Sequence, residues 1–277
     1  ISLGSVVNFA SGSAEYNAAA FDSNTGKVVI VYKQSSTDDP ALIVGEVSGT
    51  SISFGTAITL QGTDNTNGNR GITFDSNAKK IVTVYMDSSD NRNEAVVFQP
   101  AGSIATGGTI ADGKAVIVNA NGTVSTISSS SASLGSEAVF ESASVTYTNA
   151  TFDSNSNKVV VAYNDVDNSY SGTAVVGTVS GSSITFGTPV VFNSGESNWT
   201  SIAFDSNSNK VVIAYRDNGN SGYGTAIVGT VSGTSISFGT EAVFNSGNTT
   251  RMDMVFDSNS NKIVIAFADV PNGEDGT

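Results

Sequence analysis

The feature that most constrains this chain is a repeat of about 52 residues. A Phe-Asp pair followed by a polar turn occurs five times, and the successive phenylalanines are 53, 78, 52 and 52 residues apart. The five pairs begin at Phe21, Phe74, Phe152, Phe204 and Phe256. A second motif, typified by Ile-Ser-Phe-Gly-Thr, also occurs five times, at 1–5, 52–56, 132–136, 184–188 and 236–240. A chain of this kind is expected to fold as an array of similar units.

One unit, residues 199–247, contains four short runs of β-type residues. The runs are Thr200–Phe204, Val211–Tyr215, Ala226–Val231 and Ile236–Phe244. Short strands separated by Gly, Asn, Ser and Asp form an antiparallel meander. Four strands repeated at this length predict an all-β fold, a five-bladed β-propeller with four-stranded antiparallel blades.

The two ends of the chain are out of phase with the repeat. Residues 1–9 read as a fourth strand, and residues 252–277 read as a first and a second strand. We therefore expect a single domain over residues 1–277, in which Ile1–Phe9 joins the last blade, closes the ring and hides the sheet edges. The alternatives are a window of a six- or seven-bladed propeller and an open β-array. Because the chain begins with Ile1 rather than Met, we expect a fragment of a longer protein.

The long spacing marks an insertion in the second unit, over residues 100–131. Lys114–Asn119 and Thr123–Ile127 are separated by a turn containing Asn121-Gly122, which predicts a β-hairpin. We expect the serine run 128–131 to be flexible. The insertion reads either as an attachment point or as a solvent-exposed flap.

The strands also predict the core. The second strands are apolar on both faces, which is typical of strands sandwiched between sheets. We expect the small residues Gly177 and Gly229 of the third strands to let neighbouring sheets approach closely. The repeated aromatic residues at the ends of the second strands are expected in the core between units: Tyr32, Tyr85, Tyr163, Tyr215 and Phe267.

Composition excludes several classes of function. The net charge is −13, so the surface repels phosphate backbones and anionic lipid, and neither nucleic acid nor membrane insertion is expected. There is no Cys and no His, which removes disulfides, thiolate metal sites and His-dependent catalysis. No cofactor is predicted.

The recurring Asp-Ser-Asn-Ser-Asn turn has two interpretations. It is similar to the start of calcium loops with oxygen ligands, which makes a weak set of metal candidates. These candidates are Asp153, Asn155, Asn157, Asp205, Asn207 and Asn209. A plain hairpin turn is favoured, because a lysine follows where a calcium loop needs a further carboxylate. The turn also resembles the Asp-box hairpin of sialidase-type propellers, but only in part, and no functional residue follows from that.

A glycosidase needs two or three carboxylates that converge on the propeller axis from the first strands. Only Asp253 is acidic in the predicted first strands. We therefore predict that the chain is not an enzyme.

The loops that join fourth to first strands and second to third strands differ most between units, and they emerge on one face of a propeller. Aromatic side chains beside Asn, Asp and Arg suit sugar rings. The predicted ligand-binding residues are Tyr16, Arg70, Arg92, Tyr147, Tyr170, Trp199, Arg216, Tyr223, Arg251 and Asp253. The alternative is that Trp199 and the tyrosines only cap the core between units.

The repeat Phe-Asp-Ser-Asn-Ser-Asn-Lys-Val-Val-Ile-Ala-Tyr resembles tandem repeats of tail-fibre and virion surface proteins of marine bacteriophages. The resemblance covers nearly all of the chain except 100–131. It implies a location outside the cell or on a virion surface, and binding to a host receptor or glycan. Two other functions stay open: a structural virion or filament subunit that touches only neighbouring copies, and a glycosidase-like propeller.

Overall fold

The computed structural model describes residues 4–35, 37–60, 70–87, 92–106, 116–118, 124–270 and 275–276. The all-β prediction is confirmed, because these residues form antiparallel sheets with no α-helix among them; η1 (Asn218–Asn220) is a short 3-10 turn. Among them, no helix has the length and apolar character needed to cross a membrane.

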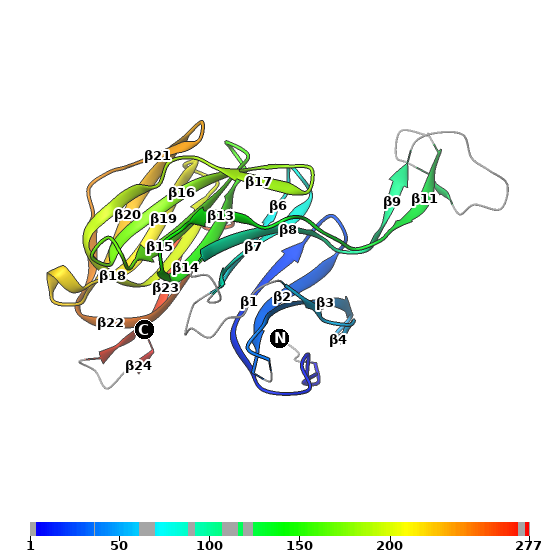
Figure 1. The fold of residues 1–277 in the computed structure, drawn as a ribbon, viewed down its shortest axis with the longest axis horizontal. Helices are drawn as coiled ribbons and strands as arrows, with labels where there is room; N and C mark the ends of the chain where they lie inside the picture. The colour runs from blue at the N-terminus through cyan, green and yellow to red at the C-terminus, as the bar shows by residue number, and fades with distance from the viewer. Residues whose placement is uncertain are drawn as a thin grey trace.

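The strands fall into five similar units (Figure 1). Unit 1 comprises β1 (Ala14–Asp22), β2 (Lys27–Gln34), β3 (Pro40–Ser48), β4 (Ser51–Phe54) and β5 (Ile58–Thr59). Unit 2 comprises β6 (Gly71–Asp75), β7 (Lys80–Asp87), β8 (Arg92–Gln99), β12 (Ser133–Leu134) and β13 (Ala138–Glu141). Unit 3 comprises β14 (Val145–Asp153), β15 (Lys158–Asp165), β16 (Ser171–Ser180), β17 (Ser183–Phe186) and the first half of β18 (Val190–Asp205).

Unit 4 begins with the second half of β18. It continues with β19 (Lys210–Asp217), β20 (Tyr223–Ser232), β21 (Ser235–Phe238) and the first half of β22 (Ala242–Asp257). Unit 5 comprises the second half of β22, β23 (Lys262–Asp269) and β24 (Asp275–Gly276). Because β18 and β22 each run through 16 residues from one unit into the next, units 3 to 5 share one continuous sheet.

Consecutive units pack side by side through their first strands. β1 contacts β6, β6 contacts β14, β14 contacts β18, and β18 contacts β22. An aromatic pair recurs at the junctions: Phe140 with Tyr163 at 5.5 Å, Phe192 with Tyr215 at 5.2 Å, and Phe244 with Phe267 at 5.4 Å between ring centroids. The second strands β7, β15 and β19 are almost wholly buried, as their sequences predict.

The Phe-Asp motif ends the first strand and forms the turn to the second. Asp153 shows the pattern: its Oδ1 accepts hydrogen bonds from the amides of Asn155 at 2.9 Å and Ser156 at 3.0 Å. Its Oδ2 accepts from the Ser156 hydroxyl at 2.7 Å. The fifth residue of every turn is left-handed, which favours Gly and Asn: Gly26, Lys79, Asn157, Asn209 and Asn261.

The third-strand glycines make room for side chains of the fourth strand in their own unit, and not for the neighbouring sheet as expected. A Cβ on Gly177 would lie 2.8 Å from both Ile184 Cδ1 and Phe186 Cε1, which belong to the fourth strand of the same unit. Gly229 has the same relation to Ile236 and Phe238. The prediction of close approach between neighbouring sheets was therefore wrong. The glycine lets the Phe186 ring fold across its own sheet, where it reaches Phe140 at 5.7 Å.

The glycine of the Ile-Ser-Phe-Gly-Thr motif fixes how one unit sits on the next. A Cβ on Gly135 would lie 1.8 Å from the Ser182 carbonyl oxygen, and one on Gly187 would lie 1.9 Å from that of Thr234. Both carbonyls belong to the hairpin turn between the third and fourth strands of the following unit. Only glycine permits this backbone contact, which we call the glycine–turn contact.

The N-terminal segment makes the same contact. A Cβ on Gly4 would lie 1.6 Å from the Thr50 carbonyl oxygen, and Phe9 packs on Tyr32 at 5.2 Å. Residues 4–9 therefore dock on unit 1 as fourth strands dock elsewhere. They form no strand with unit 5, contrary to the expectation for Ile1–Phe9, because the third strand that would carry them comprises only Asp275–Gly276 in the described part. Residues 1–3 lie outside the described residues, and closure into a five-bladed ring stays a prediction.

The insertion forms a small sheet that projects from the five units (Figure 1). β10 (Val116–Val118) pairs with β11 (Val124–Ser130), which also pairs with β9 (Gly102–Thr106). The turn at Asn121-Gly122 lies outside the described residues. The serine run was expected to be flexible, but 128–130 belongs to β11, because β9 supplies backbone partners for it.

The glycine–turn contact predicts a large difference between two equivalent glycines. Gly187→Ala should lower the free energy of unfolding by roughly 1–3 kcal/mol or prevent folding, because backbone cannot yield to the new methyl group. Gly239 holds the same motif position, but its Cβ would meet only Val228 O at 3.8 Å, so Gly239→Ala should have little effect. Urea unfolding of both variants is the measurement. Equal stability of the two would contradict this account of docking.

The buried tyrosines predict the behaviour of the protein at high pH. Burial, followed by the hydrogen bond to Glu241 at 2.8 Å, raises the pKa of Tyr215 above its ordinary value. The same causes raise the pKa of Tyr85 beside Glu137, and burial and the charge of Glu141 raise that of Tyr163. A raised folded-state pKa means that stability is intact below about pH 10 and falls as the pH rises further, because only the unfolded tyrosines ionise readily.

Tyrosinate absorbance, followed together with circular dichroism, tests this. Of the eight tyrosines, these three should ionise only as the protein unfolds. Tyr215→Phe should therefore reduce the rise in tyrosinate absorbance that accompanies unfolding by the amount expected for one tyrosine. Ionisation of all eight tyrosines in a protein that is still folded would refute the claim that burial raises the pKa of these three.

Candidate functional site

The first strands carry a bulge at the same place in four units. The pairing register shifts between Glu15 and Ala18 in β1, and equivalent shifts occur in β14, β18 and β22. One residue in each bulge has a left-handed backbone: Tyr16 (φ 52°), Tyr147 (φ 52°), Trp199 (φ 54°) and Arg251 (φ 49°). Bulky residues rarely adopt this conformation, which costs about 1–3 kcal/mol and is concentrated at functional sites.

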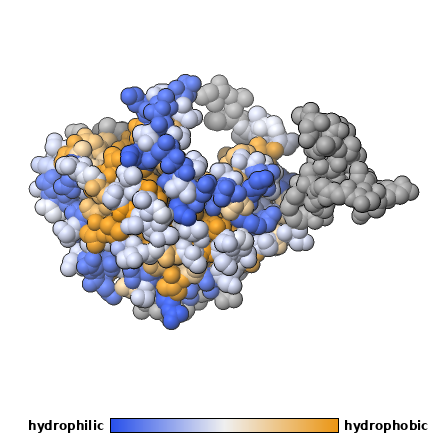
Figure 2. Space-filling view, turned by 90° about the horizontal axis from the view of Figure 1, so that it is seen from above, coloured by the Kyte–Doolittle hydropathy of each residue, from blue (hydrophilic) through white to orange (hydrophobic). Residues whose placement is uncertain are grey.

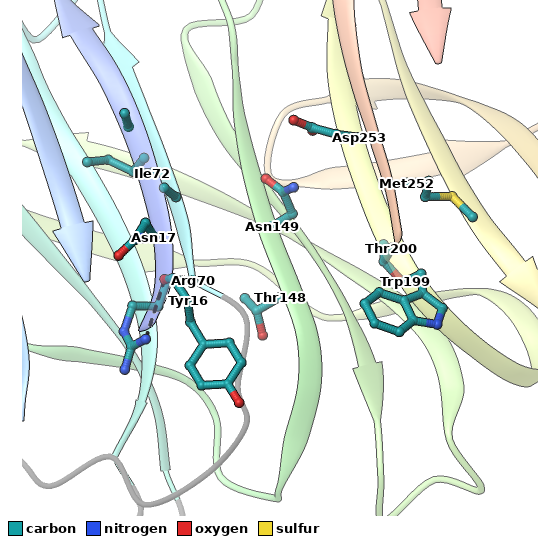
Figure 3. A pocket seen from close by; sticks show the side chains of 12 residues that line it. Tyr16, Asn17, Arg70, Ile72, Thr148, Asn149, Trp199, Thr200, Met252 and Asp253 are labelled. Carbon is teal, nitrogen blue, oxygen red and sulfur yellow. Dashed lines mark hydrogen bonds between the residues drawn. The ribbon is translucent and has the colours of Figure 1, made fainter. Parts of the chain in front are cut away.

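All five first strands line one pocket, with a volume of about 380 Å³ (Figure 3). Each strand contributes residues at or just after the bulge position. The lining residues are Tyr16, Asn17, Ala18, Ala19, Arg70, Ile72, Thr148, Asn149, Trp199, Thr200, Met252 and Asp253. We call this the central pocket.

The pocket combines an aromatic wall with polar groups. Trp199 stacks on Tyr147 at 5.2 Å between ring centroids with an interplanar angle of 45°. Arg70, which is nine-tenths buried or more, donates from Nη1 to the Tyr16 carbonyl oxygen at 3.5 Å on the opposite side (Figure 3). Thr200 is 3% exposed, and its Oγ1 has no hydrogen-bond partner among the described residues. A ligand hydroxyl in the pocket could supply that partner.

Asp253 is the single carboxylate among the lining residues. Its Oδ1 accepts hydrogen bonds from the Ser201 hydroxyl at 3.2 Å and from the Met254 amide at 2.9 Å. A hydrolytic pair of carboxylates is therefore missing from the lining of this pocket.

The structure brings some of the predicted site residues together. Tyr16, Arg70, Trp199 and Asp253 line the central pocket. Tyr147 joins them by stacking on Trp199. The pKa of Tyr147 is raised by burial, and the positive charge of Arg216 opposes this shift. Arg216 lies on β19 opposite Asn198, the residue before Trp199, and is outside the pocket lining.

The other predicted residues lie outside the pocket lining. Arg92 begins β8, where it pairs with Asp87 across the strands. Tyr170 is exposed in the loop before β16, and Tyr223 begins β20. Arg251 occupies the bulge of β22 with an exposed side chain.

Sequence reasoning missed Thr148, Thr200 and Met252. They follow directly after the bulge residue, four positions before the repeated phenylalanine. Aligning the units on that phenylalanine would have placed them beside Asn17 and Arg70.

The Asp-Ser-Asn-Ser-Asn turns lie at the other end of the first strands. Their aspartates already accept hydrogen bonds within the turn, as Asp153 and Asp205 do. In the described part of the chain, no group of three or more His, Cys, Asp or Glu could hold a metal ion. Calcium binding at these turns stays a prediction.

Comparison with known proteins supports the fold alone. No protein-family model and no curated protein sequence matches the chain. Two solved structures of AofleA from Arthrobotrys oligospora are similar in fold, one of them a variant with three arginines replaced by alanine. The variant has a TM-score of 0.55 and 9% sequence identity, over 94% of this chain and 66% of that one. The second structure has a TM-score of 0.51 and 9% identity, over 92% of this chain and 64% of that one. The chain thus spans just under two thirds of the AofleA chains.

Strain at the bulges predicts the effect of glycine at an exposed bulge position. Arg251→Gly should raise the free energy of unfolding by about 1 kcal/mol relative to Arg251→Ala, because glycine adopts a positive φ without penalty. Both variants remove the same side chain, so their difference reports the backbone. Chemical denaturation measures it, and an alanine variant as stable as the glycine variant would argue against strain.

Proposed function

We propose that this chain is a non-enzymatic recognition module that binds a glycan or a glycan-bearing receptor through the central pocket. The observation that carries the proposal is that the first strands of all five units line one pocket with unlike residues at or just after the bulge position. Tyr16, Tyr147, Trp199 and Arg251 hold equivalent strained positions. Strain repeated four times, at positions held by Tyr, Tyr, Trp and Arg, fits a scaffold whose variable positions serve binding.

The chemistry of the pocket suits a sugar. The apolar faces of Trp199 and Tyr16 can stack on ring carbons, while Asn17, Asn149 and Thr200 offer amide and hydroxyl groups for ring hydroxyls. A volume of about 380 Å³ lies at the small end of ligand pockets, which is appropriate for one or two sugar rings. The single carboxylate, Asp253, supports binding without hydrolysis.

The five-bladed propeller belongs to this proposal. It is supported by the succession of first strands around one pocket and by residues 4–9, which dock on unit 1 as a fourth strand of a preceding unit would. In a closed ring, unit 5 precedes unit 1, and residues 4–9 would be its fourth strand.

The proposed setting is a tail fibre, or another virion or bacterial surface protein outside the cell. The support is the resemblance of the repeat to phage virion repeats, together with the net charge of −13, which suits a soluble exterior domain. The partner would be a cell-surface glycan or protein receptor.

A structural role is the second candidate, and one observation favours it. Large apolar side chains are exposed where units 1 and 5 have no neighbour: Val6 at 95%, Phe21 at 57%, Val255 at 58% and Val264 at 53%. Apolar areas lie among hydrophilic ones on the face seen in Figure 2. Exposed apolar side chains of this kind can pack against a neighbouring copy in a fibre.

Trp199 is the single tryptophan of the chain, so its fluorescence reports the central pocket directly. We expect a host-type glycan found on a glycan array to change this emission. Trp199→Ala should weaken binding about tenfold, because stacking of the C–H face of a sugar ring on one aromatic side chain contributes roughly 1 kcal/mol beyond the burial of the ring. Phe21→Ala is the matched control, since Phe21 is an exposed aromatic at the far end of a first strand.

Three outcomes would overturn the proposal. Binding indifferent to Trp199→Ala would remove the central pocket. An absence of glycan binding, together with self-association in light scattering, would favour the structural role. Hydrolysis of a bound polysaccharide that is lost in Asp253→Asn would show an enzyme.

A further inference from the structure

Asp253 places a negative charge in the wall of the central pocket. It is the single carboxylate among the lining residues, and its side chain is exposed. None of the ion pairs between described residues involves it. Figure 3 shows its carboxyl group directed away from β22 and into the space between the first strands. A carboxylate in this position is accessible to a ligand that enters the pocket.

The two oxygens of Asp253 differ in what they bind. Oδ1 accepts hydrogen bonds from the Ser201 hydroxyl at 3.2 Å and from the Met254 amide at 2.9 Å. Oδ2 accepts no hydrogen bond from any described residue. One oxygen therefore fixes the orientation of the side chain, and the other is available to a donor on a ligand.

The fold does not require an acid at this position. The third residue before the repeated phenylalanine is, in units 1 to 5, Ala18, Gly71, Asn149, Ser201 and Asp253. Asn149 makes the same local contact as Asp253, because its Oδ1 accepts a hydrogen bond from the amide of the next residue, Ala150, at 2.8 Å. An asparagine would therefore serve the backbone of β22 as well as the aspartate does. The negative charge of Asp253 is not needed for any contact between described residues.

The positive charge in the pocket wall lies on the other side. Arg70 is 4% exposed, and its Nη1 donates to the Tyr16 carbonyl oxygen at 3.5 Å (Figure 3). A ligand that fills the pocket also covers Asp253 and removes water from it. Covering a charge without an opposite charge beside it is unfavourable, and a neutral ligand group offsets this only in part. A ligand with a positive charge at that end pairs with Oδ2, whereas an anionic group there is repelled.

The rest of the pocket determines what kind of molecule carries this charge. Trp199 offers an aromatic face, and Asn149 offers an Nδ2 group that makes no hydrogen bond within the described residues. An aromatic face beside an amide donor suits a ring that bears hydroxyl groups. An amino sugar combines such a ring with one ammonium group, which donates hydrogen bonds and accepts none.

We propose that the central pocket binds an amino sugar, a hexose in which an ammonium group replaces one hydroxyl, and that Oδ2 of Asp253 accepts a hydrogen bond from this ammonium group. The inference rests on the proposed function and names the ligand class. Asp253 is then the residue that determines specificity. N-acetylated, neutral and acidic sugars bind more weakly, because none of them brings a positive charge to Oδ2.

The emission of Trp199, followed with matched series of sugars, tests this proposal. The probes are glucosamine, galactosamine and mannosamine, their N-acetyl derivatives, and glucose, galactose and mannose, all at equal ionic strength. At least one amino sugar should bind about tenfold more tightly than its N-acetyl and hydroxyl counterparts, which is the gain expected from a hydrogen bond between charged groups. Glucuronate should bind more weakly than glucose.

Asp253→Asn is the matched variant, because Asn149 shows that this strand position accepts an asparagine. It should abolish the advantage of the amino sugar and leave the affinity for the parent hexose nearly unchanged. Asp253→Ser copies Ser201 of unit 4, and it gives the same test if the asparagine variant folds poorly. Asp167→Asn is the control and should retain the preference, since it removes the same charge from an exposed position outside the pocket lining.

The contrary outcomes are distinguishable. Equal binding of each amino sugar and its parent hexose would refute the amino-sugar assignment and leave the proposed function standing. A preference that persists in both Asp253 variants would show attraction to the net charge of the protein and refute the role of Asp253. Ethanolamine that binds as tightly as the amino sugar would show a plain cation site. If no sugar of any series and no array glycan changed Trp199 emission, the assignment and the proposed function would both be overturned.

Discussion

The structure depends on the contact between the glycine of one fourth strand and the hairpin turn of the following unit. Gly135 and Gly187 bring backbone against backbone at a distance that no side chain would permit. The aromatic pairs beside this contact, such as Phe192 with Tyr215, fill the space between the sheets. Together they fix the angle between units 2 and 3 and between units 3 and 4. At Gly55 and Gly239 a Cβ would meet nothing closer than 3.8 Å, and the neighbouring units pack there through their first strands, β1 on β6 and β18 on β22. An array of packed sheets needs directional contacts of this kind, because hydrophobic packing alone is not directional.

The second principle is the separation of scaffold from recognition. The Asp turns, the buried second strands and the motif glycines are nearly the same in every unit. The bulge residues differ, although Tyr16, Tyr147, Trp199 and Arg251 share one strained backbone conformation. The scaffold sustains that strain because the strands on either side of each bulge are held by regular pairing and buried side chains. The loops of units 3 and 4 differ in the same way. Asn164 donates hydrogen bonds to the carbonyl oxygens of Tyr170 and Ser197, whereas the Nε of Arg216, at the equivalent position, has no hydrogen-bond partner among the described residues.

Much of this architecture could be predicted from the sequence. The spacing of the Phe-Asp pairs predicted the units, and the Asp turn predicted the two strand ends beside it within one residue, at Asp205 and Lys210. The run Ile236–Phe244, predicted as one strand, is divided between β21 and β22. Other features depend on geometry that no periodicity reveals. The bulges were missed because a register shift leaves no mark in the alternation of residues, and without the bulge Thr148 and Thr200 had no reason to face a pocket. Gly177 was assigned the wrong neighbour because a sequence cannot tell which of two aromatic side chains will cross a glycine. The docking of residues 4–9 on unit 1 was not predicted, and their expected pairing with unit 5 depended on a third strand of which only two residues are described.

The central claim is that all five units enclose one pocket, and a distance between its first and last strands tests it most directly. The chain contains no cysteine, so Ala19→Cys with Asp253→Cys provides two unique sites, on β1 and on β22, for spin labels. The account predicts a single narrow distance distribution, short enough to span a cavity of about 380 Å³. A broad distribution, or a distance comparable to the length of the whole molecule, would contradict it.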